Sequence, residues 1–145
     1  MAKDTQHFKV SEFTCKCGCG KNNIDQRVID MAETIRKTLG VPVHVNSGCR
    51  CDKHNKAVGG VKSSKHLKGL AADLSSSKGA AVMFETAKRL KADGKLPDLD
   101  YCILYKWGIH IDCGGKRRNM WEVRAGPMTC SDILFISSSA VSSVS

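Results

Sequence analysis

The sequence has few aromatic residues and no long apolar run, and these two features argue against a membrane-spanning protein and against a nucleic-acid-binding protein. None of its apolar stretches approaches the roughly 20 residues needed to cross a bilayer. Its first ten residues are polar, with no apolar stretch behind them. We therefore expect no secretory signal peptide, and a protein that stays in the cytoplasm until something else releases it. Two Trp, two Tyr and four Phe are not interleaved with basic residues, so we expect no nucleic-acid partner.

Positive charge and cysteine are both abundant in the chain. It carries 23 Lys and Arg against 14 Asp and Glu, a formal net charge of +9. Such a charge favours polyanions, namely nucleic acid, anionic membranes or an anionic cell wall, without choosing among them. The eight cysteines are an even number, as in disulfide-bonded secreted proteins. The expected lack of an export signal, however, argues against secretion and so against an oxidising compartment.

Five of the cysteines lie in two short segments of the sequence. Cys15, Cys17 and Cys19 alternate with other residues in a Cys/Gly-rich loop, and Cys49 and Cys51 follow later. These cysteines can form disulfides after release, remain thiols, or hold a second zinc ion. Because their C-x-C spacing is tighter than the C-x-x-C of structural zinc sites, we favour disulfides or thiols over a metal.

Hydrophobic periodicity and turn residues predict two helices and four strands. We expect helices at about 25–39 and 80–92, and strands at about 41–45, 70–74, 101–105 and 109–113. Residues 49–65, rich in Gly, Asn, Ser and Lys, are expected to form a long functional loop. The order of these elements predicts an α+β fold, a small antiparallel sheet flanked by helices. We expect one domain over residues 1–126 and a flexible serine-rich tail over residues 127–145.

A histidine and an aspartate, His66 and Asp73, lie seven positions apart on either side of Gly69. If residues 70–74 form a strand, Asp73 shares one face with Ala71 while the leucines at both ends face the core. We therefore expect the carboxylate to project back toward His66, where the preceding loop ends.

A second polar pair, His110 and Asp112, alternates with Ile109 and Ile111. In a strand the isoleucines face the core, so the polar pair lines a cleft. Two histidines and one carboxylate suit Zn²⁺ and leave a fourth position for a water whose pKa the metal lowers to about 7. Each residue also has an ordinary structural explanation, as a surface histidine, a capping aspartate or a buried histidine, so spacing alone leaves the metal site open.

The motif S-x-H-x-x-G-x-A-x-D, which runs from Ser64 to Asp73, is followed by H-x-D at residues 110–112. This combination resembles the zinc D-alanyl-D-alanine carboxypeptidase family, whose relatives include phage L-alanyl-D-glutamate endopeptidases and the hedgehog signalling domain. Residues 45–50 resemble the family's S-G-x-R segment, and residues 13–20 and 54–60 resemble its phage and prophage branch. The resemblance extends over about residues 8–124 and implies a hedgehog/D-Ala-D-Ala peptidase-like fold.

The resemblance implies a role for each matching residue. His66, Asp73 and His110 match the zinc ligands of the family. Arg50 matches a substrate-binding arginine, whose planar guanidinium suits a carboxylate. Ser64 matches a serine near the metal, which we expect to orient a ligand or a substrate group. Arg50 can also be read as an ordinary surface charge of a loop.

The sequence departs from the family at the general base. Many relatives carry Glu, Asp or His a few positions before the last ligand, but residues 104–109 contain no carboxylate. Asp112 is our candidate, because it shares a strand face with His110. An equal alternative is that Asp112 only orients that histidine, and Tyr105 can stabilise the oxyanion instead.

These patterns predict a zinc-dependent peptidase that hydrolyses peptidoglycan stem or cross-link peptides, with a metal-activated water attacking the amide. We expect a monomeric enzyme of the phage or prophage endolysin type, which acts on the anionic cell wall after release. One alternative is a zinc-containing module that binds the cell wall without catalysis, as the missing base allows. A less favoured alternative is a nucleic-acid-binding zinc protein.

Overall fold

The computed structural model describes residues 2–115 and 119–125. Its elements in chain order are η1 (Val10–Phe13), α1 (Gln26–Leu39), β1 (Val43–Ser47), α2 (Asp52–Ala57), η2 (Lys65–Lys68), β2 (Ala71–Ser76), α3 (Ala80–Ala92), β3 (Tyr101–Tyr105), β4 (Ile109–Asp112) and β5 (Trp121–Arg124). The serine-rich tail predicted over residues 127–145 lies outside the described residues. No helix of the described part is long and apolar enough to cross a membrane.

The first long helix, α1, begins and ends at residues that cap it. The Asp25 side chain accepts a hydrogen bond from the backbone N–H of Arg27 at 2.9 Å, which satisfies a free donor of the first turn. Gly40 adopts a left-handed φ of 72° and donates to the carbonyl of Arg36, which ends the helix. Its apolar side chains recur at helical spacing and are buried: Val28, Ile29, Met31, Ala32, Ile35 and Leu39.

The strands form one five-stranded sheet in the order β1-β2-β4-β3-β5. The first three neighbouring pairs are antiparallel, whereas β5 lies parallel to β3. The predicted α+β fold is confirmed, with a mixed sheet in place of a wholly antiparallel one. Sequence patterns missed β5 because none of its four residues is fully buried, so it lacks the apolar alternation of a core strand.

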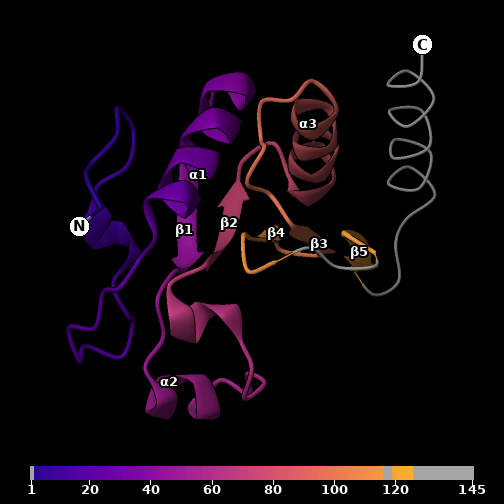
Figure 1. Ribbon diagram of the computed structural model, residues 1–145. Helices are drawn as coiled ribbons and strands as arrows, with labels where there is room; N and C mark the ends of the chain where they lie inside the picture. Colours follow the sequence, from indigo (N-terminus) through magenta and orange to yellow (C-terminus); the bar gives the residue numbers. More distant parts are fainter. Residues whose placement is uncertain (1, 116–118, 126–145) are drawn as a thin grey trace.

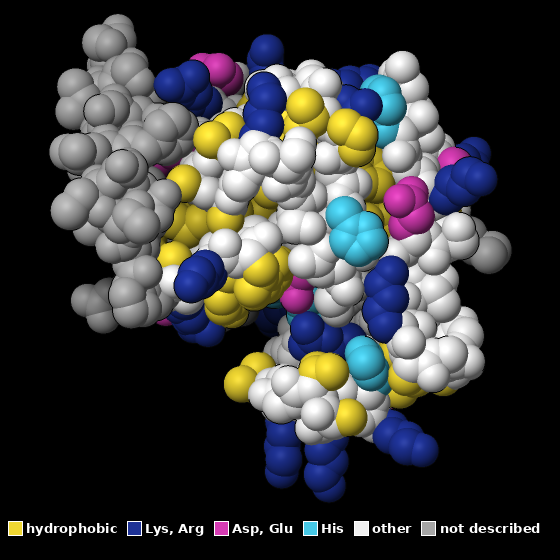
Figure 2. Space-filling view, turned by 180° about the vertical axis from the view of Figure 1, so that it is seen from behind, with side chains coloured by type: hydrophobic (Ala, Val, Ile, Leu, Met, Phe, Trp, Pro, Cys, Tyr) yellow, Lys and Arg dark blue, Asp and Glu magenta, His cyan; other side chains and the backbone are white. Residues whose placement is uncertain are grey.

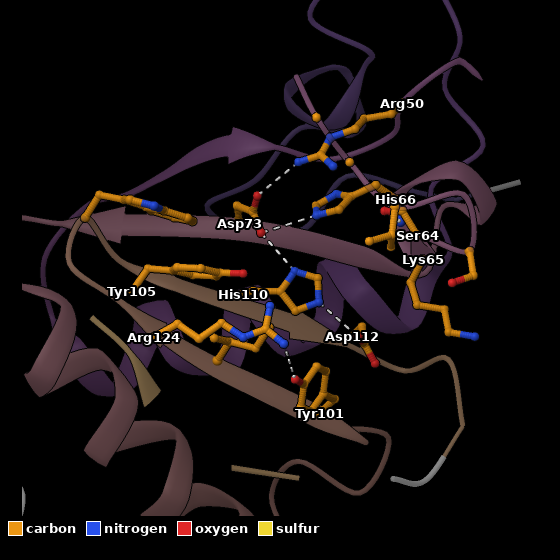
Figure 3. Close-up of a pocket in the computed structure, with 16 residues that line it drawn as sticks. Arg50, Ser64, Lys65, His66, Asp73, Tyr101, Tyr105, His110, Asp112 and Arg124 are labelled. Atoms are coloured by element: carbon orange, nitrogen blue, oxygen red, sulfur yellow. Dashed lines mark hydrogen bonds and ion pairs between the residues drawn. The ribbon is translucent and has the colours of Figure 1, made fainter. Parts of the chain in front are cut away.

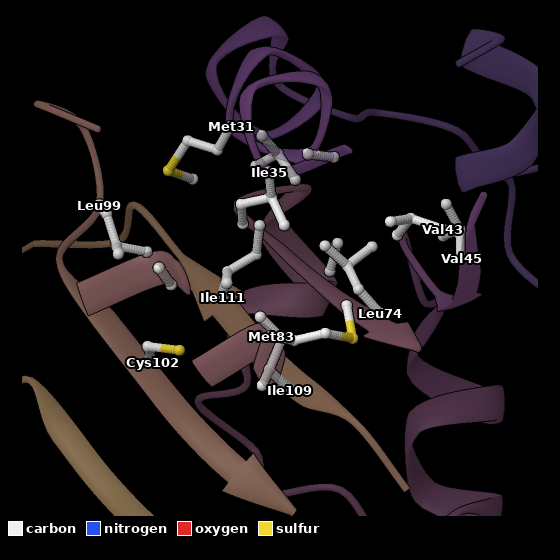
Figure 4. Packing of buried hydrophobic residues seen from close by; sticks show 14 of the residues in the cluster. Met31, Ile35, Val43, Val45, Leu74, Met83, Leu99, Cys102, Ile109 and Ile111 are labelled. Atoms are coloured by element: carbon white, nitrogen blue, oxygen red, sulfur yellow. The ribbon is translucent and has the colours of Figure 1, made fainter. Parts of the chain in front are cut away.

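Both long helices, α1 and α3, cover the same face of the sheet (Figure 1). Between helices and sheet lies a single apolar core, to which α1 contributes Met31 and Ile35 and α3 contributes Met83 (Figure 4). The sheet contributes alternate residues of its strands to this core, among them Leu74 and Ile109. The side chains between them therefore emerge on the opposite face, which no long helix of the described part covers.

The segment 49–65, predicted to be a long loop, contains the short helix α2. Cys51 caps it, because its Sγ accepts from the backbone N–H of His54 at 3.3 Å. Asn55 is the only buried residue of the helix, so the helix has no apolar stripe that a sequence pattern could reveal. A short 3-10 turn, η2, then leads into β2.

The core position of Leu74 gives a stability prediction. Its side chain is 0 % exposed in β2, so we expect Leu74→Ala to lower the free energy of unfolding by about 2–5 kcal/mol through lost burial and a cavity. The matched control is Val61→Ala at a side chain that is 66 % exposed, where a change within about 0.5 kcal/mol is expected. Urea unfolding of both variants measures the difference, and equal losses would contradict this assignment of the core face.

Candidate metal centre

The register of the two central strands brings an aspartate and a histidine together. β2 and β4 are antiparallel, with Asp73 directly opposite His110 and Ala71 opposite Asp112. Side chains directly opposite each other in such a pair share one face and have Cβ atoms about 4.5–5.5 Å apart. The two residues therefore meet on the uncovered face of the sheet, although 37 positions separate them in the sequence.

The second histidine, His66, arrives from η2, immediately before β2. Ser64 caps this turn, since its hydroxyl accepts from the backbone N–H of His66 at 3.3 Å. Gly69 ends the turn with a φ of 69°, and a Cβ at this position would lie 2.0 Å from the carbonyl oxygen of Asn23. The glycine of the S-x-H-x-x-G motif is thus required by a left-handed turn packed against another backbone segment.

The orientation of the His66 ring is set by a backbone carbonyl. Its Nδ1 lies 2.7 Å from the carbonyl oxygen of Gly48. A carbonyl oxygen only accepts, so Nδ1 carries the proton and donates this hydrogen bond. The other ring nitrogen, Nε2, therefore faces the Asp73 carboxylate and lies 3.3 Å from its Oδ1.

The His110 ring lies between two carboxylates. Its Nδ1 is 3.0 Å from Oδ1 of Asp73, and its Nε2 is 2.9 Å from Oδ2 of Asp112. Asp112 is completely buried, and its Oδ1 also accepts from the backbone N–H of Gly114 at 3.4 Å. Asp112 therefore contacts the edge of the ring opposite the one that faces Asp73 (Figure 3).

Three donor atoms converge at one point. One ring nitrogen of His66, one ring nitrogen of His110 and one carboxylate oxygen of Asp73 all lie within 4.8 Å of one another. Ligands at about 2.0–2.1 Å from a tetrahedral ion are about 3.3 Å apart, close to the 3.3 and 3.0 Å separations from the Asp73 oxygen. Two imidazoles and one carboxylate are the donor set of catalytic zinc sites, so the residues fit such an ion.

The two ionisable groups at the centre stabilise each other's charged forms. Burial would raise the pKa of Asp73, but hydrogen bonds and ion pairs with His110 and His66 hold it far below its usual range. Burial would also lower the pKa of His110, but contacts with Asp112 and Asp73 outweigh it and raise this pKa above that of an ordinary histidine. The centre therefore keeps Asp73 ionised, as a metal ligand must be.

An open cleft lies over this centre, between the sheet and the lobe that contains α2 (Figures 2 and 3). The lobe lines it with Gly59, Gly60, Val61 and Ser63, and the sheet side lines it with Tyr101, Ile103, Tyr105, Trp107 and Arg124. Arg50, Lys65 and Arg124 give this cleft three cationic side chains. Among the described residues, the acidic side chains of its lining are those of Asp73 and Asp112, both engaged with histidines.

Arg50 lies at the edge of the metal centre. Its guanidinium contacts Oδ2 of Asp73 at 3.4 Å, the Asn55 side chain at 3.3 Å and the Ser47 hydroxyl at 3.2 Å. The side chain is only 15 % exposed, so it is not an ordinary surface charge. Several hydrogen bonds hold the guanidinium at the wall of the cleft, where it can meet an anionic group.

Several residues of the site were not predicted from the sequence, among them Asn55, Tyr101 and Arg124. Asn55 holds Arg50, while Tyr101 and Arg124 line the cleft from β3 and β5. Tyr101 shares a strand face with Tyr105, and this period-2 alternation was the available signal for it. Arg124 had no such signal, because its position depends on the pairing of β5 with β3.

A family model for peptidase M15 matches residues 6–112, well over half of the chain. The chain belongs to the peptidase M15 family. The matched segment includes Arg50, the three residues that converge on the metal centre, and Asp112, but not β5. The resemblance is thus confirmed at the level of the family, a family of metallopeptidases, and the structure contains a His-Asp-His cluster able to hold a metal ion. The comparison with curated protein sequences gives no match.

The two carboxylates around His110 give a prediction for the metal-free peptidase. Replacing Asp112 with Asn removes one of the charges that raise the pKa of His110, so we expect Asp112→Asn to lower this pKa. Histidine titration by NMR measures the change. Asp100→Asn is the control, because the Asp100 carboxylate accepts from the backbone N–H of Gly115, whereas the carboxylates bonded to His110 in the described part of the chain are those of Asp73 and Asp112. An unchanged pKa in the first variant would contradict this contact.

The raised pKa of His110 also makes the stability of the metal-free protein depend on pH. Because the pKa of His110 is raised in the folded state, its stabilising contribution is complete below the ordinary histidine value of about 6.5. This contribution is lost as the pH rises through the higher folded-state value. We expect the free energy of unfolding of the metal-free protein to fall over that window, and to fall less in Asp112→Asn, as measured by urea unfolding at a series of pH values.

Proposed function

We propose that this M15 peptidase is a zinc enzyme that hydrolyses the peptides of peptidoglycan. The observation that carries the proposal is the convergence of His66, Asp73 and His110 at the floor of an open cleft. Three ligands from the protein leave one position of a tetrahedral ion facing the cleft, as in catalytic zinc sites. Bound there, zinc would act as a Lewis acid and lower the pKa of a coordinated water to about 7.

The residues around the three ligands have positioning roles in this proposal. The Gly48 carbonyl keeps the Nε2 lone pair of His66 available, and the Ser64 hydroxyl holds the backbone of the same histidine. Asp112 fixes the ring of His110 by accepting from Nε2, so that Nδ1 faces the metal position. Its complete burial and its place behind the ring favour this positioning role over that of general base.

The charge of the cleft supports an anionic peptide as substrate. Arg50 presents its guanidinium beside Asp73, and Lys65 and Arg124 line the same cleft. The stem peptides of peptidoglycan carry free carboxylates close to their amide bonds, and a guanidinium binds such a group with two parallel hydrogen bonds. We infer that Arg50 binds a substrate carboxylate next to the bond that is cut.

Tyr105 is our candidate for stabilising the developing oxyanion. Its ring stacks on Trp107 with centroids 5.0 Å apart and an interplanar angle of 10°. In Figure 3 its hydroxyl points toward His110 and the metal centre. A phenol held by stacking is a donor whose position is set before the substrate binds, which is what oxyanion stabilisation requires.

We further propose an endolysin-type role, of phage or prophage origin. The net charge of +9 favours association with an anionic cell wall. The likeness of residues 13–20 and 54–60 to the phage and prophage branch supports the same assignment. The alternative, a module that binds the wall without catalysis, is favoured by one observation: no uncommitted carboxylate lines the described part of the cleft.

Cleavage of isolated peptidoglycan tests the function directly. We expect release of new peptides, their loss on chelation, and recovery on zinc addition; mass spectrometry of the new termini names the bond. His110→Ala is expected to release none, because it removes a metal ligand. Stoichiometric zinc and binding to the wall, without any released peptide, would instead establish the non-catalytic module.

Arg50→Lys tests the substrate-binding role. It keeps the charge but removes the planar fork, so we expect kcat/KM to fall about 10- to 100-fold, mainly through KM. Arg36→Lys is the matched control, since Arg36 lies on α1, on the other face of the sheet. An unchanged KM at full zinc content would remove Arg50 from substrate binding.

A further inference from the structure

A second group of potential metal ligands lies outside the peptidase centre. The Sγ atoms of Cys15, Cys17, Cys19 and Cys51 all lie within 4.8 Å of one another. The seven cysteines of the described residues are free, and Cys130 lies outside that part of the chain. The proposed peptidase chemistry uses none of these four thiols.

The sulfur separations match a shared metal ion better than disulfides. Sγ of Cys17 is 3.5 Å from that of Cys15 and 3.6 Å from that of Cys51. A disulfide requires about 2.05 Å, whereas thiolates bound at about 2.3 Å to a tetrahedral zinc ion stand about 3.8 Å apart. Disulfides also join sulfurs in separate pairs, while four sulfurs gathered around one point are the arrangement that a single ion needs.

Two glycines explain how cysteines so close in sequence reach one point. In an extended strand, the Cα atoms of alternate residues lie about 6.6–6.8 Å apart, and a turn in the chain brings their side chains closer together. Gly18 and Gly20 have φ of 87° and 83°, left-handed values at which the chain turns after each of the last two cysteines of the loop. The C-x-C spacing that argued against a metal is therefore compatible with one, because the chain turns at residues 16–17 and again at Gly18.

Backbone N–H groups are directed at three of the sulfurs. The N–H of Cys51 points at Sγ of Cys15 at 3.4 Å, and that of Lys21 at Sγ of Cys19 at 3.4 Å. The N–H of His54 points at Sγ of Cys51 at 3.3 Å. Such donors stabilise thiolates, the form in which cysteine binds a metal, and they orient the sulfur lone pairs.

We propose that Cys15, Cys17, Cys19 and Cys51 bind a second zinc ion, distinct from that of the peptidase centre. Four thiolates complete a tetrahedral shell and leave no position for water or substrate, so this site is structural. Cys17 and Cys19 are exposed, which gives the ion a path to solvent.

The second ion would join the N-terminal loop to the segment that carries Arg50. Cys51 follows Arg50 directly, whereas the other three cysteines belong to the loop before α1. The two segments also touch without a metal, since the N–H of Cys49 donates to the carbonyl of Phe13 at 2.8 Å. A zinc bridge at Cys51 would fix the backbone next to Arg50, whose guanidinium contacts Asp73.

Zinc counting on separate variants tests the proposal. We expect about two zinc ions per chain in protein purified under reducing conditions, and about one after Cys17→Ser combined with Cys19→Ser. His66→Ala combined with His110→Ala should also leave about one, because it empties the other site. Cys49→Ser is the matched control, expected to keep both ions, since Cys49 lies outside the cluster and bonds Asn22 instead.

Cobalt substitution distinguishes the two sites by their ligands. Thiolate-bound Co²⁺ gives an intense charge-transfer band in the near ultraviolet, which we expect in the wild type and in the double histidine variant but not in the double cysteine variant. One zinc per chain in the wild type together with an unchanged count in the cysteine variant overturns the proposal. Disulfides among these cysteines in the unreduced protein, found by peptide mapping, overturn it as well. Neither readout depends on peptide cleavage, so the result stands even if the proposed peptidase activity is absent.

Discussion

The site depends on the antiparallel register of β2 and β4, which sets Asp73 opposite His110. A shift of one residue would turn each of these side chains to the other face of the sheet and expose leucine and isoleucine in their place. The register is held by the alternation of core and cleft residues on both strands, because Leu74 and Ile109 are buried against the helices. Packing on one face of the sheet therefore positions the polar chemistry on the other.

Placing Asp73 on that face has an electrostatic cost, since the carboxylate is almost completely buried. Two histidines and Arg50 surround it and compensate for the water it has lost. His110 is in turn held by Asp112, so positive and negative groups alternate from Arg50 through Asp73 and His110 to Asp112. Such a chain of contacts leaves each group one preferred orientation, and it keeps the donor atoms close together.

The segment 48–51 connects the two clusters of potential metal ligands. Gly48 orients His66 through its carbonyl, and Cys49 binds the N-terminal segment through its N–H. Arg50 reaches Asp73, and Cys51 joins the other three cysteines. Four consecutive residues thus have four different partners, so this segment links the wall of the cleft at Arg50 to the Cys/Gly-rich loop.

By itself, the sequence determined the elements with strong periodicity: both long helices, four strands and the α+β class. These follow from local rules, namely apolar spacing, the Asp25 cap and the Gly40 stop. It also indicated the candidate metal ligands, because His66, Asp73 and His110 lie in two short motifs that can be recognised in the sequence, S-x-H-x-x-G-x-A-x-D and H-x-D. Tertiary structure alone decided the parallel pairing of β5, the burial of Asp112 behind His110 and the gathering of Cys51 with a loop more than 30 residues away. Each of these depends on contacts between segments distant in sequence, and no local pattern of residues encodes which segments will meet.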